Sequence, residues 1–218
     1  ALLGAIAPPT IIPMGIDCQK FSSGNGEILR ARLEKDQLLI LFVGRLVEKK
    51  GVKDLITAYS LLTKEQRNQT HIWIVGDGSE RKSLEIQSRS LQLTDKVSFL
   101  GKLPNEQLPD YYAAADIFIA PSLTEGQGVM LLEAMAAGTA IVSTTTGGIS
   151  EVVDHCITGL LSSPKQPLEL KSAIIKLIES VNLRKDMAIK GKHAAQAYDW
   201  STISLKFNTL YQQVKRTK

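Results

Sequence analysis

The sequence predicts an α/β fold, in which a parallel β-sheet carries helices on both faces. Short apolar runs of the kind found in buried strands alternate along the chain with segments whose apolar residues recur at helical spacing. The first three of these runs end at Gly44, Gly76 and Gly101, which is typical of the step from a strand into a loop. Strands separated by helices of moderate length favour parallel pairing within one sheet.

The elements are expected in the following order. Six strands are predicted, at 38–43, 71–75, 97–100, 116–120, 140–143 and 159–161. The helix after the first strand is indicated by apolar residues on one helical face, at Val52, Leu55, Ile56, Tyr59 and Leu62. Further helices are expected between Gly78 and Leu91 and over 108–114, 129–137 and 149–153. Beyond Pro167 the pattern is helical, with apolar stripes at Leu170, Ile174, Leu177 and Ile178 and along the last helix from Ile203 to Val214.

Length and composition are those of a soluble globular protein. Of the 218 residues, 44% are hydrophobic and 22% charged, which disfavours a disordered chain, and the apolar runs are too short for a transmembrane helix. The two cysteines, Cys18 and Cys156, lie far apart, so a zinc site or disulfide framework is disfavoured and a reducing cytoplasm is expected. The net charge of +4 is compatible with anionic ligands or an anionic membrane surface, while no basic and aromatic cluster indicates nucleic-acid binding.

The loops that follow the strands are the candidate sites, because ligands of parallel sheets bind beyond the carboxyl ends of the strands. The first loop contains Arg45 and Lys50, a planar fork of donors and a compact cation that suit a diphosphate. A solvated basic loop explains the same two residues. The second loop has Arg81 where a dinucleotide-binding fingerprint needs its third glycine, so we interpret it as a tight turn capped by Ser79.

The segment 121–138 is the most informative, because a glycine-rich loop leads into a helix that begins at about Gly128 or Val129. The free N–H groups and positive dipole end of that helix form an anion site. Glu133, one turn further on, is surrounded by apolar residues and needs a partner, either a ribose diol or an internal ion pair. Glu125 lies in the loop, where it either points into the same cleft or is an exposed acid. The later loop 143–151 is rich in glycine and threonine and either supplies further donors to the cleft or is a plain turn.

Seven short motifs occur in an order that resembles the group-one retaining glycosyltransferases, family four of the sugar-nucleotide-dependent enzymes. They are Phe42-Val43-Gly44-Arg45, Lys50-Gly51, Val75-Gly76-Asp77-Gly78, Phe99-Leu100-Gly101, Glu125-Gly126-Gln127-Gly128, Leu132-Glu133-Ala134-Met135-Ala136 and Thr146-Gly147-Gly148-Ile149-Ser150-Glu151-Val152. The resemblance extends from about Ile11 to the end of the chain. It implies a Rossmann-like domain that forms the C-terminal half of a GT-B fold.

The resemblance also implies a division of the chain. Residues 1–17 are expected to be an interdomain linker with a remnant of a missing N-terminal domain, and residues 18–198 the donor-binding domain. Residues 199–218 are expected to form a C-terminal helix that packs back toward the N-terminal domain. The chain starts with Ala1 rather than methionine and without a basic leader, so we expect a piece cut from a longer protein, without a signal peptide.

Residue roles are implied by the same resemblance. Arg45 and Lys50 would hold the donor diphosphate and stabilise the charge of the leaving group. Glu133 would bind the ribose hydroxyls and Glu125 the hydroxyls of the donor sugar. The sugar would also meet backbone N–H groups from Gly126, Gln127, Gly128, Val129 and Met130, and the nucleobase would meet the backbone at Lys102 and Leu103. Gln127 departs from the family, which often has an aromatic or aliphatic residue there, so its side chain either contacts the donor sugar or faces solvent.

The expected function is therefore binding of a nucleoside-diphosphate sugar. In the full-length enzyme, of the hexosyltransferase class, the glycosyl group would pass with retention to an acceptor sugar or lipid-linked saccharide, without a metal or other cofactor. The piece alone is expected to be inactive, and the protein is placed in the cytoplasm, with a peripheral contact to the inner face of the membrane open. A GT-B sugar-nucleotide epimerase, which the Glu125 to Glu133 pattern disfavours, and a non-catalytic nucleotide-binding module are the alternatives.

Overall fold

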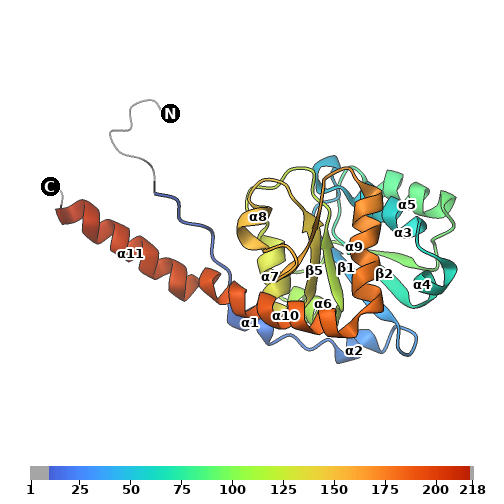
Figure 1. Ribbon diagram of the computed structural model, residues 1–218, viewed down its shortest axis with the longest axis horizontal. Helices are drawn as coiled ribbons and strands as arrows, with labels where there is room; N and C mark the ends of the chain where they lie inside the picture. Colours follow the sequence, from blue (N-terminus) through green and yellow to red (C-terminus); the bar gives the residue numbers. More distant parts are fainter. Residues whose placement is uncertain (1–9, 217–218) are drawn as a thin grey trace.

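The computed structural model describes residues 10–216, so the first nine residues of the predicted linker and the last two of the C-terminal helix lie outside the described residues. A six-stranded parallel sheet stands at its centre, with helices on both faces (Figure 1). The predicted fold class is confirmed. The strands are β1 (Leu38–Val43), β2 (Thr70–Val75), β3 (Val97–Gly101), β4 (Ile117–Ala120), β5 (Ala140–Thr144) and β6 (Gly159–Ser162).

The order of the strands across the sheet is β3-β2-β1-β4-β5-β6. The chain builds outward from β1 to β3, then returns to place β4 on the other side of β1, with Ile40 beside Ile117 in the register. The strand order therefore reverses between β1 and β4, and ligands of open parallel sheets bind in the crevice at such a reversal. The loops after β1 and β4 border that crevice.

Two hydrophobic cores, one on each face of the sheet, hold the helices in place. Alternate side chains of each strand point to opposite faces, so Leu39 and Leu41 belong to one core while Ile40 and Phe42 belong to the other. On the first face lie α1 (Cys18–Ser22), α2 (Glu27–Arg30), α6 (Leu108–Ala114), α7 (Val129–Ala137) and α8 (Ile149–Val152). The second face is covered by α3 (Val52–Ser60), α5 (Arg81–Ser90) and α9 (Pro167–Glu179).

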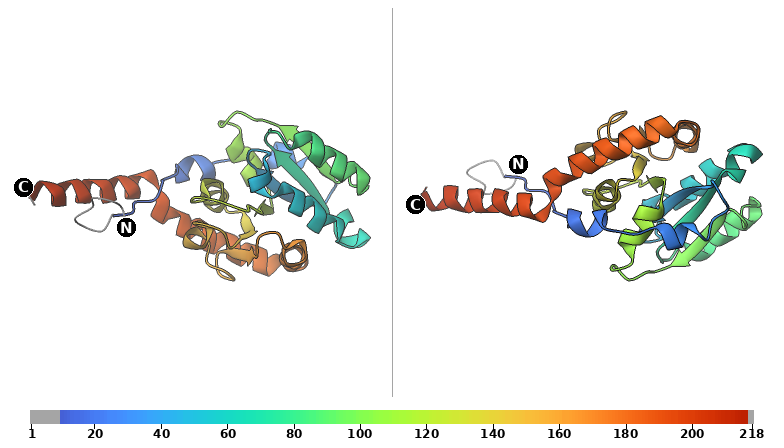
Figure 2. Two further views of the ribbon diagram at one scale, coloured as in Figure 1. Left: turned by 90° about the horizontal axis from the view of Figure 1, so that it is seen from above. Right: turned by 90° about the horizontal axis from the view of Figure 1, so that it is seen from below.

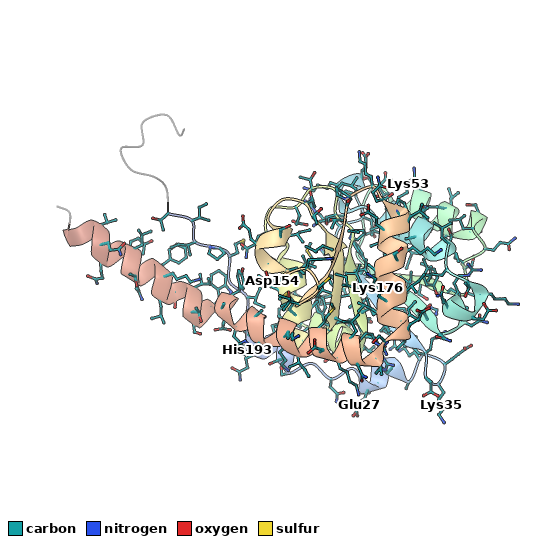
Figure 3. The ribbon with its side chains drawn as sticks, in the orientation of Figure 1. Glu27, Lys35, Lys53, Asp154, Lys176 and His193 are labelled. Atoms are coloured by element: carbon teal, nitrogen blue, oxygen red, sulfur yellow. The ribbon has the colours of Figure 1, made fainter. Side chains whose placement is uncertain are left out.

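The remaining helices are α4 (Lys64–Asn68), α10 (Val181–Ala195), α11 (Trp200–Arg216) and the 3-10 turns Glu48–Lys50 and Gln196–Tyr198. Of these, α10 packs against α7 and β5. Charged side chains on the outside of the domain, such as Lys35, Lys53 and Lys176, are exposed to solvent (Figure 3). One predicted cap is wrong: α5 begins at Arg81 with Glu80 as its N-cap and no capping side chain, so Ser79 lies one residue too early.

The last helix, α11, extends away from the sheet, and the incoming segment crosses its start (Figure 1, Figure 2). At the crossing, the Ile16 amide donates to the Tyr198 carbonyl over 2.9 Å, and the Trp200 amide donates to the Ile16 carbonyl over 3.0 Å. The incoming segment and the start of α11 are thus joined by backbone hydrogen bonds on one side of the domain. Within residues 10–216, none of the helices combines the length and apolar character needed to cross a bilayer.

Candidate functional site

The loops after β1 and β4 are pressed together backbone to backbone at the crevice. The Leu123 amide donates to the Lys49 carbonyl over 2.8 Å. Gly51 has a φ of +65°, and a Cβ there would come within 1.9 Å of the Pro121 carbonyl oxygen. Only glycine permits this approach, so the position of one loop determines the position of the other.

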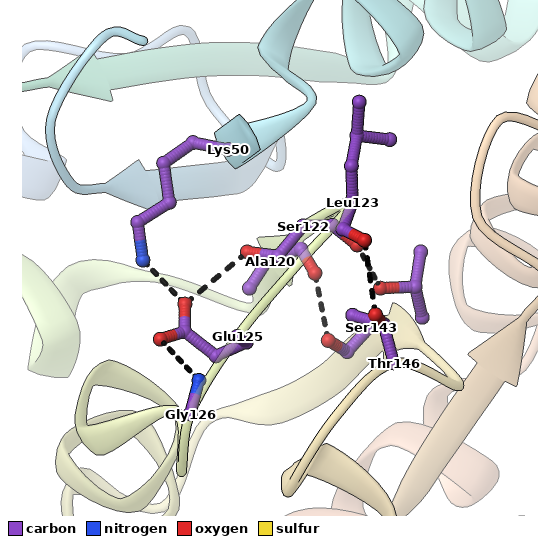
Figure 4. A network of polar contacts seen from close by, with 9 residues as sticks. Lys50, Ala120, Ser122, Leu123, Glu125, Gly126, Ser143 and Thr146 are labelled. Atoms are coloured by element: carbon purple, nitrogen blue, oxygen red, sulfur yellow. Dashed lines mark hydrogen bonds and ion pairs between the residues drawn. The ribbon is translucent and has the colours of Figure 1, made fainter. Parts of the chain in front are cut away.

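Lys50 and Glu125, one from each loop, form an ion pair between Lys50 Nζ and Glu125 Oε2 (Figure 4). The side chains are 9% and 15% exposed, so the pair is largely removed from water. Ser122 Oγ also donates to Glu125 Oε2 over 3.4 Å, and the Gly126 amide donates to Glu125 Oε1 over 3.3 Å. The structure thus brings two predicted site residues together. Lys50 is not a solvated residue of a basic loop, and Glu125 is not an exposed loop acid, the two alternatives considered from the sequence.

Arg45 lies on the same loop as Lys50 but is exposed. Its guanidinium takes part in no ion pair or hydrogen bond with the residues that the structure describes. Lys102 and Leu103 follow β3 at the edge of the sheet, where Lys102 is exposed and Leu103 packs against the core of the first face. The sheet order places these two residues two strands away from β1.

Glu133 lies on α7 and receives a hydrogen bond of 2.7 Å from the Tyr112 hydroxyl to its Oε2. Burial raises the pKa of Glu133, while the hydrogen bond from Tyr112 and the charge of Lys20 act in the opposite direction. No ion pair joins Glu133 to another described residue, so the internal ion pair considered from the sequence is wrong. Sequence reasoning missed Tyr112 because it lies on a different helix, α6, 21 positions earlier.

The start of α7 has the geometry of an anion site. Gly128 is its N-cap with a φ of +77°, a left-handed conformation that favours glycine. The first N–H groups of the helix, including those of Val129 and Met130, have no acceptor within the helix itself. A Cβ placed on Gly126 would meet open space, so the side of the loop at this residue is clear. Backbone donors, a helix dipole and empty space therefore coincide at the end of the crevice.

Gln127 makes a contact that neither interpretation from the sequence anticipated. Its amide group pairs with the backbone of Met14, with the Met14 amide donating to Gln127 Oε1 over 2.6 Å and Gln127 Nε2 donating to the Met14 carbonyl over 2.8 Å. Because both ends of the side-chain amide are used, Gln127 links the glycine-rich loop to the incoming segment. The residues are 113 positions apart, so no local signal could have indicated the pair.

The threonine-rich loop makes contacts that neither interpretation from the sequence anticipated. Three hydroxyls donate to backbone carbonyls around the end of β4, that of Ser143 to the last residue of the strand and those of Thr144 and Thr146 to the loop that follows (Figure 4). These three hydroxyls therefore bind backbone groups rather than point into the cleft. The segment is more than a plain turn, because it holds the end of β4 and the loop after it. In the described part of the chain, no group of three or more histidine, cysteine, aspartate or glutamate side chains is placed to hold a metal ion.

Comparison with known proteins gives a consistent picture. The family model described as glycosyl transferases group 1 matches residues 27–194. The D-inositol 3-phosphate glycosyltransferase of Corynebacterium jeikeium is 32% identical over 215 residues, which covers 94% of this chain and 51% of that protein. Curated relatives are matched over about half of their length.

Two solved structures show the same architecture. Sucrose-phosphate synthase of Thermosynechococcus elongatus superposes with a TM-score of 0.86 at 29% identity, covering 96% of this chain and 53% of that chain. HepE of Anabaena, solved in complex with UDP-glucose, superposes with a TM-score of 0.84 at 28% identity, covering 94% of this chain and 57% of that one.

Proposed function

Because this chain belongs to the family of group 1 glycosyl transferases, we propose that it binds a nucleoside-diphosphate sugar in the crevice between the β1 and β4 loops. The observation that carries the proposal is the buried Lys50, held by Glu125 beside the open backbone at Gly126. A largely buried cation next to a helix N-terminus is arranged for an anionic ligand. The complex of HepE with UDP-glucose supports a donor of this class.

The diphosphate is assigned to Arg45 and Lys50. Arg45 is exposed and unpaired among the described residues, so its planar fork is available to two phosphate oxygens. Lys50 has three N–H donors and can contact a phosphate oxygen while it still holds Glu125. Both cations would stabilise the negative charge that develops on the leaving diphosphate when the sugar departs.

The remaining donor groups follow from the same placement. Glu125, with backbone N–H groups from Gly126 to Met130, would contact the sugar. Glu133 has one oxygen occupied by Tyr112, and its second oxygen, Oε1, is left to accept from the ribose. The backbone at Lys102 and Leu103 would meet the nucleobase. No step in this arrangement calls for a metal ion.

The whole protein is proposed to transfer the glycosyl group with retention of configuration to a sugar or lipid-linked saccharide held by a further domain, in the cytoplasm or at the inner face of the membrane. The apolar face of α11 supports an interdomain role for this helix. Trp200, Phe207, Tyr211 and Val214 recur at helical spacing and are 49%, 39%, 61% and 55% exposed. We assign this stripe, together with the incoming segment, to contacts with that domain.

The test compares ligands and loop variants of this chain. Melting temperatures would be measured with the diphosphates of uridine, guanosine and adenosine and with UDP-glucose, because a ligand that binds the folded state raises the melting temperature. Arg45→Ala is expected to reduce the binding free energy of the best ligand by about 1.5–3 kcal/mol, the value of a charge-assisted hydrogen bond. Lys49→Ala, an exposed neighbour on the same loop, is the matched control and should leave affinity unchanged. If no nucleotide stabilises the protein, or both variants bind like the wild type, the proposed diphosphate site is wrong.

A further inference from the structure

The hydrogen-bond ladder between β4 and β5 ends where the β4 loop begins. The strands pair as far as Ala120 beside Ser143, and after Ala120 the chain leaves the sheet. From this point the side chains of the β5 segment continue the contact. Thr144 Oγ1 donates to the Ser122 carbonyl over 2.5 Å, and Thr146 Oγ1 donates to the Leu123 carbonyl over 3.0 Å (Figure 4).

The contact continues through backbone groups of the next two residues. The Gly148 amide donates to the Gly126 carbonyl over 3.0 Å and lies 3.3 Å from the Glu125 carbonyl. Gly147 has a φ of +53°, and a Cβ there would come within 1.8 Å of the Glu125 carbonyl oxygen. The Gly148 amide therefore contacts the carbonyls of Glu125 and Gly126, and the two threonines hold the carbonyls of Ser122 and Leu123.

The two threonine hydroxyls are committed to the loop. A hydroxyl has one hydrogen, so Thr144 and Thr146 cannot donate to a ligand while they donate to these carbonyls. Thr144 and Ser122 are only 2% and 1% exposed, so the Ser122 carbonyl has no water to replace the Thr144 hydroxyl. Their effect on a ligand must pass through the backbone of the β4 loop.

We propose that Thr144 and Thr146 are positioning residues that fix the β4 loop. They thereby hold Glu125 against Lys50 in the orientation in which Glu125 contacts the hydroxyls of the donor sugar. The part concerning the sugar rests on the proposed function. The positioning itself is a property of the ligand-free protein, and it can be tested without any nucleotide.

The first experiment measures the accessibility of Lys50. The protein is treated briefly with an acetylating reagent, and the modification of Lys50 is divided by that of the exposed Lys49, which serves as an internal standard. In the variant Thr144→Val/Thr146→Val this ratio is expected to rise by about 2- to 10-fold for each hydroxyl lost, the equilibrium effect of one hydrogen bond. The serine pair Thr144→Ser/Thr146→Ser keeps both hydroxyls and should return the ratio to that of the wild type.

Thr145→Val is the matched control, because Thr145 lies between the two positions and is exposed. A purely structural role predicts a lower melting temperature in the valine pair with an unchanged ratio of Lys50 to Lys49 modification in the folded protein. That result, or an equal rise in the Thr145→Val control, overturns the positioning role. Amide exchange of residues 123–126 gives a second measurement, expected to accelerate in the valine pair alone.

The second experiment measures binding of UDP-glucose and UDP to the same variants. In the valine pair the affinity for UDP-glucose is expected to fall by about 5-fold or more relative to the affinity for UDP, because Glu125 contacts the sugar. Failure of the wild type to bind either nucleotide refutes the proposed function and leaves the acetylation result to decide the positioning. An unchanged ratio of the two affinities, with nucleotide binding intact, overturns the role in reading the sugar.

Discussion

Replacing Glu125 by glutamine would leave Lys50 charged, largely buried and without its counter-ion. The two side chains are 9% and 15% exposed in their ion pair, so little water is available to solvate the lysine that remains. Removing one partner of a buried ion pair costs about 3–5 kcal/mol. The glutamine oxygen can still accept a hydrogen bond from Lys50, so the expected loss of unfolding free energy is about 3 kcal/mol, at the lower end of this range. For a domain of this size that corresponds to a fall in melting temperature of about 6–12 °C.

A nucleotide should reverse this loss. The diphosphate brings negative charge to the unpaired Lys50, so UDP is expected to bind Glu125→Gln at least as tightly as it binds the wild type. Since a ligand specific to the folded state adds its binding free energy to stability, the rise in melting temperature with saturating UDP should be at least as large in the variant. UDP-glucose should lose its sugar-dependent share of affinity in the same variant.

The assay is thermal unfolding with and without UDP, combined with calorimetry. Glu48→Gln, an exposed acid on the β1 loop, is the matched control and should change neither quantity. The double variant Glu125→Gln/Lys50→Met removes both charges and should recover part of the lost stability, because a neutral pair of similar volume is often tolerated where a single charge is not. A wild-type melting temperature for Glu125→Gln would refute the reasoning, because the ion pair would then contribute nothing to the fold.

Four further substitutions test single residues around the site. Burial raises the pKa of Glu133, so folding favours its protonated form, and Glu133→Gln should raise the melting temperature near pH 7. The difference between variant and wild type should shrink as the pH falls through the raised pKa and then the ordinary pKa of the carboxyl group. A lower melting temperature of the variant near pH 7 would contradict this. Gly126→Ala places a methyl group in open space and should weaken the binding of UDP-glucose without lowering the melting temperature. Gly147→Ala should cost more than about 1–3 kcal/mol of stability, the cost of a left-handed backbone alone, because its φ is +53° and its Cβ would also come within 1.8 Å of the Glu125 carbonyl oxygen. Gln127→Leu should accelerate amide exchange at Met14 by about 2- to 10-fold, the effect of one hydrogen bond, and unchanged exchange there would show that the pair does not form in solution.

The sequence by itself determined the sheet and its helices. Apolar runs and helical stripes report which side of each element is buried, and burial is a local property of period and composition. The predicted strand 38–43 coincides with β1, and the other predicted strands differ from the observed ones by one residue at most at either end. Helices α1, α2 and α4 were missed because each has only four or five residues, too few for a stripe to be recognised, whereas the equally short α8 was indicated by the glycine- and threonine-rich loop that leads into it.

Only the tertiary structure decided which side chains are partners. Lys50 meets Glu125 because the strand order sets β1 beside β4, although the residues lie 75 positions apart. Glu133 could be recognised from the sequence as a carboxylate that needs a partner, yet the choice of Tyr112 depended on how α6 packs against α7. Thr144 could be read equally as a ligand donor until its hydroxyl was seen on the Ser122 carbonyl. Local patterns encode how deeply a residue is buried, whereas the direction of a hydrogen bond depends on which distant backbone the topology brings within 3 Å of it.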